Sequence, residues 1–86
     1  MTRVVFHRNF KKRTKRLPRK IQEAFKKRRD LFLENPFHPI LDNHSVERAY
    51  PGWRSINITG DYRVLFEEQG DSIQFMTIGT HSELYG

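Results

Sequence analysis

Residues 53–79 read WRSINITGDYRVLFEEQGDSIQFMTIG, and this stretch decides the fold. It contains three segments rich in β-branched and aromatic residues, and Gly-Asp pairs at 60–61 and 70–71 separate them. Short runs of this composition bounded by turn residues are typical of consecutive antiparallel strands. The stretch therefore predicts a three-stranded β meander, after which the chain ends in THSELYG.

The alternation along these strands predicts which side chains share a face. The apolar positions expected to receive helices are Ile56, Ile58, Tyr62, Val64 and Phe66. A three-residue turn over 59–61 would place Asn57 opposite Arg63 on the other face, with Leu65 beside them. The sequence alone leaves open a slip of one residue, which would break this pair.

The residues before the meander predict one further strand and two helices. RVVF at 3–6 is a candidate edge strand, and 8–16 follows a helical pattern dominated by charge. A second, amphipathic helix is expected to begin near Pro18 and to end at Asn35, before Pro36.

A connector over 36–52 follows the second helix. Ile40, Leu41 and Val46 are expected to pack this connector on the core. The predicted fold is a single α+β domain of residues 1–86, in which a small antiparallel sheet, made of the N-terminal strand and the meander, packs against two helices.

Charge is distributed unevenly along the chain. Residues 1–29 hold 13 of the 16 Lys and Arg residues against one acid, Glu23, which gives a net charge of +12. Residues 30–86 carry a net charge of −6. Such asymmetry favours a polyanion or a strongly acidic protein as partner, although the cations could also simply solvate two helix faces.

The composition limits the cellular compartments in which the protein is expected. The chain has no cysteine, which excludes disulfides and thiolate metal sites. No run approaches the about 18 apolar residues of a membrane span, and the N-terminus lacks the apolar run of a signal peptide. We therefore expect a soluble cytoplasmic protein that does not interact with membranes.

Polar side chains on the meander and at its exit predict a phosphodiester site. His81 directly follows the last strand, and Tyr85 comes four residues later. Histidine transfers protons near neutrality, a tyrosine ring can stack on a base, and the fixed charge of Arg63 suits it to holding a phosphate. Taken alone, a His-x-x-x-Tyr pair such as His81 and Tyr85 is more often a packing detail at the C-terminus.

His44 and Asp61 are further candidates on loops. Asp61 could instead be only a turn residue, and His44 only a solvated loop residue. Together with His81 they could also suit a metal, but their spacing fits no known ligand motif, so we predict neither a metal nor a cofactor.

These features together resemble the RelE/ParE superfamily of bacterial toxin–antitoxin systems, and within it the YafQ-like messenger-RNA interferases. The resemblance is carried by the D-Y-R strand start at 61–63 and the terminal GTHSELYG. The N-terminal pattern FxKxxKxLPxxIQ…FxxNP at 10–36 fits as well. The resemblance therefore covers nearly the whole chain.

The resemblance implies a type II toxin that enters the ribosomal A site and cuts messenger RNA there. Such enzymes use no metal; the 2′-hydroxyl attacks the adjacent phosphate and leaves a cyclic phosphate and a free 5′-hydroxyl. The implied partners are the ribosome, messenger RNA and a cognate antitoxin with an acidic segment. Operator DNA would be bound only through the antitoxin complex.

The resemblance also assigns roles to individual residues. His81 is expected to transfer a proton, with His44 or Asp61 as its counterpart. Arg63 would hold the phosphate and Tyr85 would stack on a base or donate a hydrogen bond.

The remaining predicted site residues are expected to bind substrate. Asn57 stands where the YafQ-like pattern has a histidine, so one proton carrier is missing, but its amide could still orient the phosphate. Arg54 is a further substrate contact, and Lys11, Lys12 and Lys15 would lie along ribosomal RNA or receive the antitoxin.

Two other functions remain as alternatives. A ParE-like toxin shares the fold but poisons DNA gyrase and cuts no RNA; its members generally lack the GTHxxLY tail with a matching loop histidine. A non-catalytic module could use the basic helices to bind nucleic acid, with incidental histidines.

Overall fold

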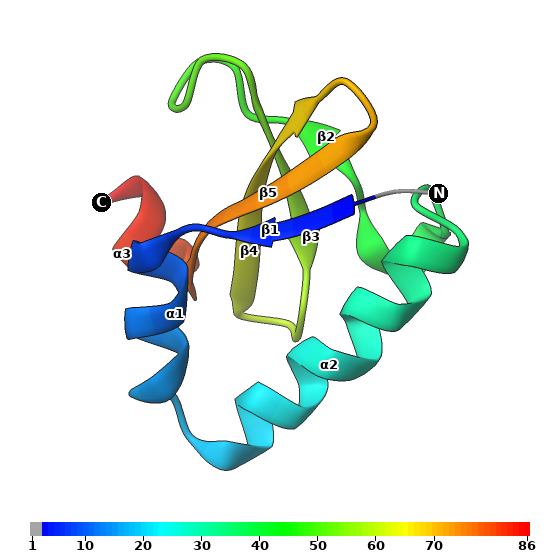
Figure 1. Ribbon diagram of the computed structural model, residues 1–86. Helices are drawn as coiled ribbons and strands as arrows, with labels where there is room; N and C mark the ends of the chain where they lie inside the picture. Colours follow the sequence, from blue (N-terminus) through cyan, green and yellow to red (C-terminus); the bar gives the residue numbers. More distant parts are fainter. Residues whose placement is uncertain (1–2) are drawn as a thin grey trace.

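Five strands form one mixed sheet in the order β1-β5-β4-β3-β2 (Figure 1). The computed structural model describes residues 3–86. Its elements are β1 (Arg3–Phe6), α1 (Arg8–Lys15), α2 (Arg19–Glu34), the 3₁₀ turn η1 (Pro39–Leu41), β2 (His44–Ser45), β3 (Trp53–Asn57), β4 (Tyr62–Gln69), β5 (Ser72–Thr80) and α3 (His81–Tyr85).

The predicted meander is confirmed. Strands β3, β4 and β5 pair antiparallel, and Asn57 lies directly opposite Arg63, as the expected register requires. The turn before β4 closes because the Thr59 hydroxyl accepts hydrogen bonds from the N–H groups of Asp61 and Tyr62. The turn between β4 and β5 uses Gly70 at φ 63°, a conformation that glycine adopts without steric cost.

The α+β class is confirmed, with one correction to the sheet. Strand β1 is an edge strand as expected, but it runs parallel to β5, so the sheet is mixed rather than wholly antiparallel. A parallel pair needs a long crossover connection, and the helices and the three strands β2, β3 and β4 between β1 and β5 supply it.

Helices α1 and α2 cover one face of the sheet (Figure 1). Their buried anchors are Phe10, Phe25 and Phe32. Phe10 and Phe25 meet each other, and all three rings meet the β-sheet aromatics Phe66 or Phe75, at centroid distances of 4.9–6.0 Å. The five apolar positions predicted for this face all belong to the same cluster, with Tyr62 partly buried at its margin. The predicted helical face is therefore confirmed.

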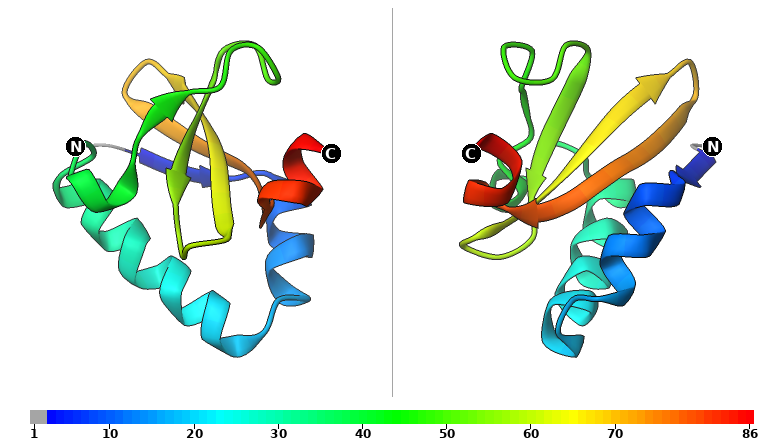
Figure 2. Two further views of the ribbon diagram at one scale, coloured as in Figure 1. Left: turned by 180° about the vertical axis from the view of Figure 1, so that it is seen from behind. Right: turned by 90° about the vertical axis from the view of Figure 1, so that its left-hand side faces the viewer.

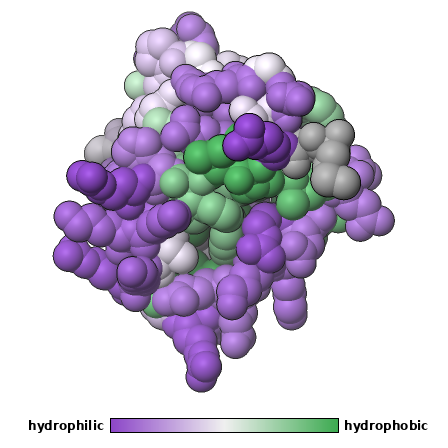
Figure 3. Space-filling model, in the orientation of Figure 1, coloured by the Kyte–Doolittle hydropathy of each residue, from purple (hydrophilic) through white to green (hydrophobic). Residues whose placement is uncertain are grey.

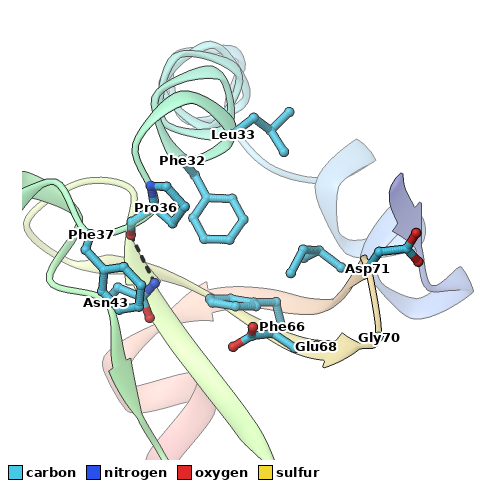
Figure 4. Close-up of a pocket in the computed structure, with 10 residues that line it drawn as sticks. Phe32, Leu33, Pro36, Phe37, Asn43, Phe66, Glu68, Gly70 and Asp71 are labelled. Atoms are coloured by element: carbon cyan, nitrogen blue, oxygen red, sulfur yellow. Dashed lines mark hydrogen bonds between the residues drawn. The ribbon is translucent and has the colours of Figure 1, made fainter. Parts of the chain in front are cut away.

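The connector has more structure than the sequence predicted, because it contains η1 and the short strand β2. Leu41 and Val46 are buried as expected, whereas Ile40 is 48% exposed, so its predicted burial is wrong. The tight turn of η1 directs Leu41 inward and leaves Ile40 outside. Asn43 fastens the connector by donating a hydrogen bond from Nδ2 to the carbonyl of Pro36 (Figure 4).

The second face of the sheet carries a smaller apolar cluster. Val46, Leu65 and Leu84 form its buried part, so the predicted placement of Leu65 on this face is confirmed. Leu84 comes from α3, a helix that the sequence analysis missed; Figure 2 shows it across the sheet from α1 and α2. This cluster supports the residues discussed next.

No helix in the described range combines the length and apolar character needed to cross a membrane.

Candidate active site

An open cleft of about 570 Å³ lies between the connector, the second face of the sheet and α3. Four of the five predicted catalytic side chains line it: His44 from β2, Arg63 from β4, and His81 and Tyr85 from α3. Residues up to 41 positions apart in the sequence therefore meet at one surface. Its wall also includes Asp42, Glu47, Arg48 and Ser55, which the sequence analysis did not identify.

Arg63 is held by the turn that precedes its own strand. Its Nη1 donates to the main-chain carbonyls of Thr59, Gly60 and Tyr62 at 3.1–3.2 Å. Within residues 3–86 the guanidinium forms no ion pair. A cation fixed at one nitrogen, with donors remaining on Nε and Nη2, suits the binding of a phosphate.

The imidazole of His44 is oriented by Asp42. Its Nδ1 lies 2.6 Å from the main-chain carbonyl oxygen of Asp42 and 3.7 Å from the carboxylate Oδ2. Because a carbonyl oxygen only accepts hydrogen bonds, Nδ1 carries a proton. Whenever the ring is neutral, its Nε2 is therefore unprotonated, the form required of a general base.

His81 begins α3 and lies against Tyr85 in a tilted arrangement, with ring centroids 4.8 Å apart and an interplanar angle of 42°. The main-chain N–H of His81 donates to the main-chain carbonyl of Asp61 at 3.1 Å. The Asp61 carboxylate itself does not line the cleft and forms no hydrogen bond or ion pair within the described residues. Asp61 therefore contacts His81 with its main-chain carbonyl and not with its carboxylate.

Tyr85 packs against Tyr50, which in turn packs against Trp53. Tyr50 meets it edge-on at 6.0 Å, stacks on Trp53 at 5.1 Å and donates its hydroxyl to the carbonyl of Leu84. Burial raises the pKa of Tyr85 above its ordinary 10.0, and the nearby Ser55 hydroxyl and Arg63 charge oppose this shift only in part. The phenol is therefore a neutral hydrogen-bond donor at pH 7.

Two buried polar atoms on β3 meet no hydrogen-bond partner among residues 3–86. They are Ser55 Oγ and Asn57 Oδ1. Because Ser55 and Asn57 are two positions apart in the strand, their side chains share one face, and Asn57 pairs with Arg63 on that face. Ser55 lies near the Tyr85 hydroxyl without a hydrogen bond of normal geometry, and it lines the cleft; Asn57 does not line it.

The remaining predicted contacts lie outside the cleft. Arg54 points toward the connector, where its Nε donates to Asn43 Oδ1 at 2.8 Å and its guanidinium lies 5.8 Å from the Phe37 ring centroid. The three predicted lysines line a separate groove of about 650 Å³ along α1: Lys11, Lys12 and Lys15. The structure therefore divides the predicted site into a cleft and a distinct basic surface.

Two further findings concern ligands. Within residues 3–86, no group of three or more His, Asp or Glu side chains is arranged to hold a metal ion. A smaller pocket of about 190 Å³, between the end of α2 and the β4–β5 hairpin, contains none of the predicted catalytic residues (Figure 4).

Comparisons with known proteins agree with this fold. YafQ from E. coli strain BL21(DE3) superposes with a TM-score of 0.84 at 18% identity, covering 100% of both chains. A chain of the RelB–RelE antitoxin–toxin complex from Methanococcus jannaschii gives 0.74 at 23% identity over 94% of each chain. A chain of the E. coli DinJ–YafQ complex gives 0.68 at 16% identity over 100% of both.

A search of curated protein sequences found no significant match. A family model described as "Bacterial toxin of type II toxin-antitoxin system, YafQ" matches residues 2–86, nearly the whole chain. The chain therefore belongs to the YafQ family of bacterial type II toxins.

Proposed function

We propose that this toxin is a ribosome-dependent endoribonuclease that cleaves messenger RNA in the ribosomal A site without a metal or cofactor. The observation that carries the proposal is the convergence of two histidines, an arginine and a tyrosine on one cleft. A basic surface on α1 lies outside that cleft and is available for larger polyanions.

The reaction is an internal transesterification. The O2′–P bond forms, the P–O5′ bond breaks, and the products are a 2′,3′-cyclic phosphate and a 5′-hydroxyl. A base takes the 2′-hydroxyl proton, an acid protonates O5′, and a cation stabilises the charge that develops on the phosphoryl oxygens. Arg63 supplies that cation from a position fixed by three carbonyls.

The two histidines divide the proton transfers between them. His44, on β2, offers a free Nε2 when neutral, and His81, on α3, lies against the Tyr85 ring in the same cleft. One histidine must be neutral and the other protonated, which gives a bell-shaped dependence of the rate on pH with apparent values that belong to the pair. Asp61 remains a predicted counterpart of His81, and Asn57 a predicted substrate contact.

Tyr85 serves substrate placement. Its ring is held edge-on by Tyr50 and contacted by the tilted ring of His81, so it offers a preformed aromatic surface to an unstacked base. Its neutral hydroxyl can also donate to a phosphoryl oxygen.

A cognate antitoxin is the second proposed partner, because related toxins were solved as DinJ–YafQ and RelB–RelE complexes. Figure 3 shows an apolar area on the face of α1 and α2 surrounded by hydrophilic side chains. A groove of about 260 Å³ between these helices is lined by Phe6, Phe10 and Phe25 together with Lys11 and Lys15. An amphipathic acidic segment fits such a groove by charge and by apolar contact.

Ribosomal RNA and the antitoxin would compete for this basic surface. The same lysines that suit an acidic peptide also suit RNA phosphates, whose binding weakens steeply with salt. The antitoxin would then neutralise the toxin by blocking its binding to the ribosome. Operator DNA would be bound only through the antitoxin in the complex.

The experiment that tests the function is primer extension on a defined messenger RNA in translating ribosomes, with wild type, His81→Ala and His7→Asn. His7 is the matched control, since it lies outside the cleft and its N-cap acceptor is retained by asparagine. We expect codon-phased cuts from wild type and His7→Asn, and none from His81→Ala.

The other outcomes are equally decisive. Growth arrest without any cuts would replace the proposal with gyrase or another target. Equal cutting by all three proteins would retain the function but remove His81 from the reaction. Binding of free RNA that survives His81→Ala, with no cutting on ribosomes, would indicate a non-catalytic module.

A further inference from the structure

Arg13 of α1 contacts the junction between β5 and α3 through three separate interactions. Its Nε donates to the carbonyl of Ile78 at 2.8 Å, and its Nη2 lies 3.5 Å from Glu83 Oε2. The guanidinium also passes over Gly79, where a Cβ atom would lie 2.7 Å from Nη2. Only a residue without a side chain leaves room for this contact.

The junction that Arg13 contacts is also the start of α3. Thr80 caps the helix: its hydroxyl accepts from the N–H of Glu83, and Glu83 Oε1 accepts from the N–H of Thr80 at 2.8 Å. Glu83 thus uses one carboxylate oxygen for the cap and the other for Arg13. The cap and the contact with α1 form one network.

This network determines where two cleft residues lie. His81 is the first residue of α3 and Tyr85 the last, and the helix is only five residues long. A helix of this length is not stable by itself, so its orientation depends on tertiary contacts. On the cleft side these contacts come from Tyr50 and Leu65, and on the α1 side from Arg13.

We propose that Arg13 is a positioning residue that holds His81 and Tyr85 in their working orientation from outside the cleft. The inference rests on the proposed nuclease function, because its kinetic consequence is a loss of cleavage. Arg13 itself does not line the cleft, so it acts through Gly79 and Glu83 rather than on RNA.

Gly79→Ala is the decisive variant, because its Cβ would lie 2.7 Å from Arg13 Nη2 and 3.3 Å from Glu83 Oε1, so that it disturbs the contact between Arg13 and the start of α3 without changing any charge. The φ of Gly79 is not in the left-handed region, so alanine adds no backbone strain there. Gly60→Ala is the matched control, since nothing lies within 4 Å of its added Cβ and its φ is likewise unstrained. Arg13→Met removes the donors and keeps the apolar stem, with Arg19→Met as its control for lost charge.

The readouts are single-turnover cleavage on programmed ribosomes and hydrogen exchange of the α3 amides. Gly79→Ala and Arg13→Met should each lower the rate at saturating toxin about 10- to 100-fold, the effect expected of small displacements of reacting groups. The half-saturating concentration should stay near that of the control variants. The double variant should be no slower than the slower single one, because both changes remove the same contact.

Glu83→Gln provides a second route if either variant folds poorly. Glutamine retains the capping box and removes the ion pair with Arg13, so an intermediate loss of rate is expected. All three variants should exchange their α3 amides faster than Gly60→Ala.

Several results would overturn the inference. A Gly79→Ala protein that matches Gly60→Ala in rate and exchange would show that the contact has no positioning role. An Arg13→Met protein altered only in half-saturating concentration would make Arg13 an RNA contact. If wild type cuts no RNA, the proposed function fails, and α3 exchange alone still decides whether Arg13 holds the helix.

Discussion

Ser55 of β3 is the direct cross-strand neighbour of His44 of β2, and its hydroxyl is buried without a hydrogen-bond partner among residues 3–86. Native proteins seldom leave a buried hydroxyl unpaired, because its lost hydration is not replaced. A polar atom of this kind, beside His44 and near Tyr85 in the cleft, indicates that the site accepts a stability cost for function.

Ser55→Ala should therefore separate stability from activity. Removal of the unpaired hydroxyl should leave the free energy of unfolding unchanged or raise it by about 1 kcal/mol. Cleavage should fall several-fold if the hydroxyl pairs with Tyr85 or with substrate during the reaction. Urea unfolding and cleavage rates, with Ser72→Ala in the distant β4–β5 hairpin as control, measure both effects.

A loss of stability together with activity would indicate that Ser55 only supports the packing of the sheet. Unchanged activity would remove it from the site.

Because of the hydrogen bonds of the Glu83 carboxylate, we expect the free energy of unfolding to fall in acid. The hydrogen bond from the Thr80 N–H, followed by that from its hydroxyl, holds the pKa of Glu83 below its ordinary 4.5, and Arg13 adds to this. A carboxyl group whose folded pKa is depressed stabilises the fold above its unfolded pKa, and this contribution is lost as pH falls through the folded pKa. Urea unfolding of wild type and Glu83→Gln below pH 5 should therefore show a smaller acid dependence in the variant.

Glu34→Gln serves as the control, because Glu34 is exposed and forms no hydrogen bond or ion pair within the described residues. An identical acid dependence in wild type and Glu83→Gln would show that the cap does not carry the effect.

The sequence predicted the sheet better than it predicted the site. The β meander and the Asn57–Arg63 pair follow from alternation and turn residues, which are local signals. The apolar stripe of α2 was equally readable, because Phe25 and Phe32 repeat at helical spacing. Each of these features depends on residues close together in the chain.

The missed features depend on contacts between distant segments. Strand β2 has two residues and exists because it pairs with β3, so no periodicity marks it. The parallel pairing of β1 is likewise set by the crossover. The α3 helix did have a local signal, since Thr80 and Glu83 fit the capping box S/T-x-x-E, but its length of five residues gives no periodic pattern.

The division of the site could not be read from the sequence either. Arg54 and Ser55 are adjacent in the chain, yet strand alternation places them on opposite faces, and only Ser55 reaches the cleft. Asp61 approaches His81 with its main-chain oxygen, which residue type alone does not reveal.

Tyr85 predicts a change at the alkaline end of the pH range. Burial raises its pKa above 10.0, so the fold favours the neutral phenol. This contribution to stability is present below the unfolded pKa and is lost as pH rises through the folded pKa. Phenolate absorbance of wild type minus Tyr85→Phe should titrate above pH 10.0, and Ser55→Ala should raise the midpoint further by removing an opposing contribution.

A Tyr85 midpoint at or below that of free tyrosine would mean that the phenol is solvated, and would contradict the buried arrangement with Tyr50. A midpoint unaffected by Ser55→Ala would show that the Ser55 hydroxyl does not influence the pKa of Tyr85.

The basic surface of α1 predicts a specific salt dependence. Binding to RNA releases counterions, and each lost phosphate contact lowers the slope of log affinity against log salt. Changing Lys11, Lys12 and Lys15 to Gln should therefore reduce the steepness of ribosome binding by about 2 to 3 units of slope, measured in a His81→Ala background that leaves RNA intact. Affinity for the antitoxin should fall in the same variant if both partners use this surface.

A second triple variant separates location from total charge. Lys20, Lys27 and Arg28 line a different patch on α2, and their change to Gln removes the same three charges. If binding follows the groove on α1, this control should change the slope far less. Equal slopes in the two triple variants would show that ribosome binding responds to net charge alone, and the competition between RNA and antitoxin for Lys11, Lys12 and Lys15 would lose its structural basis.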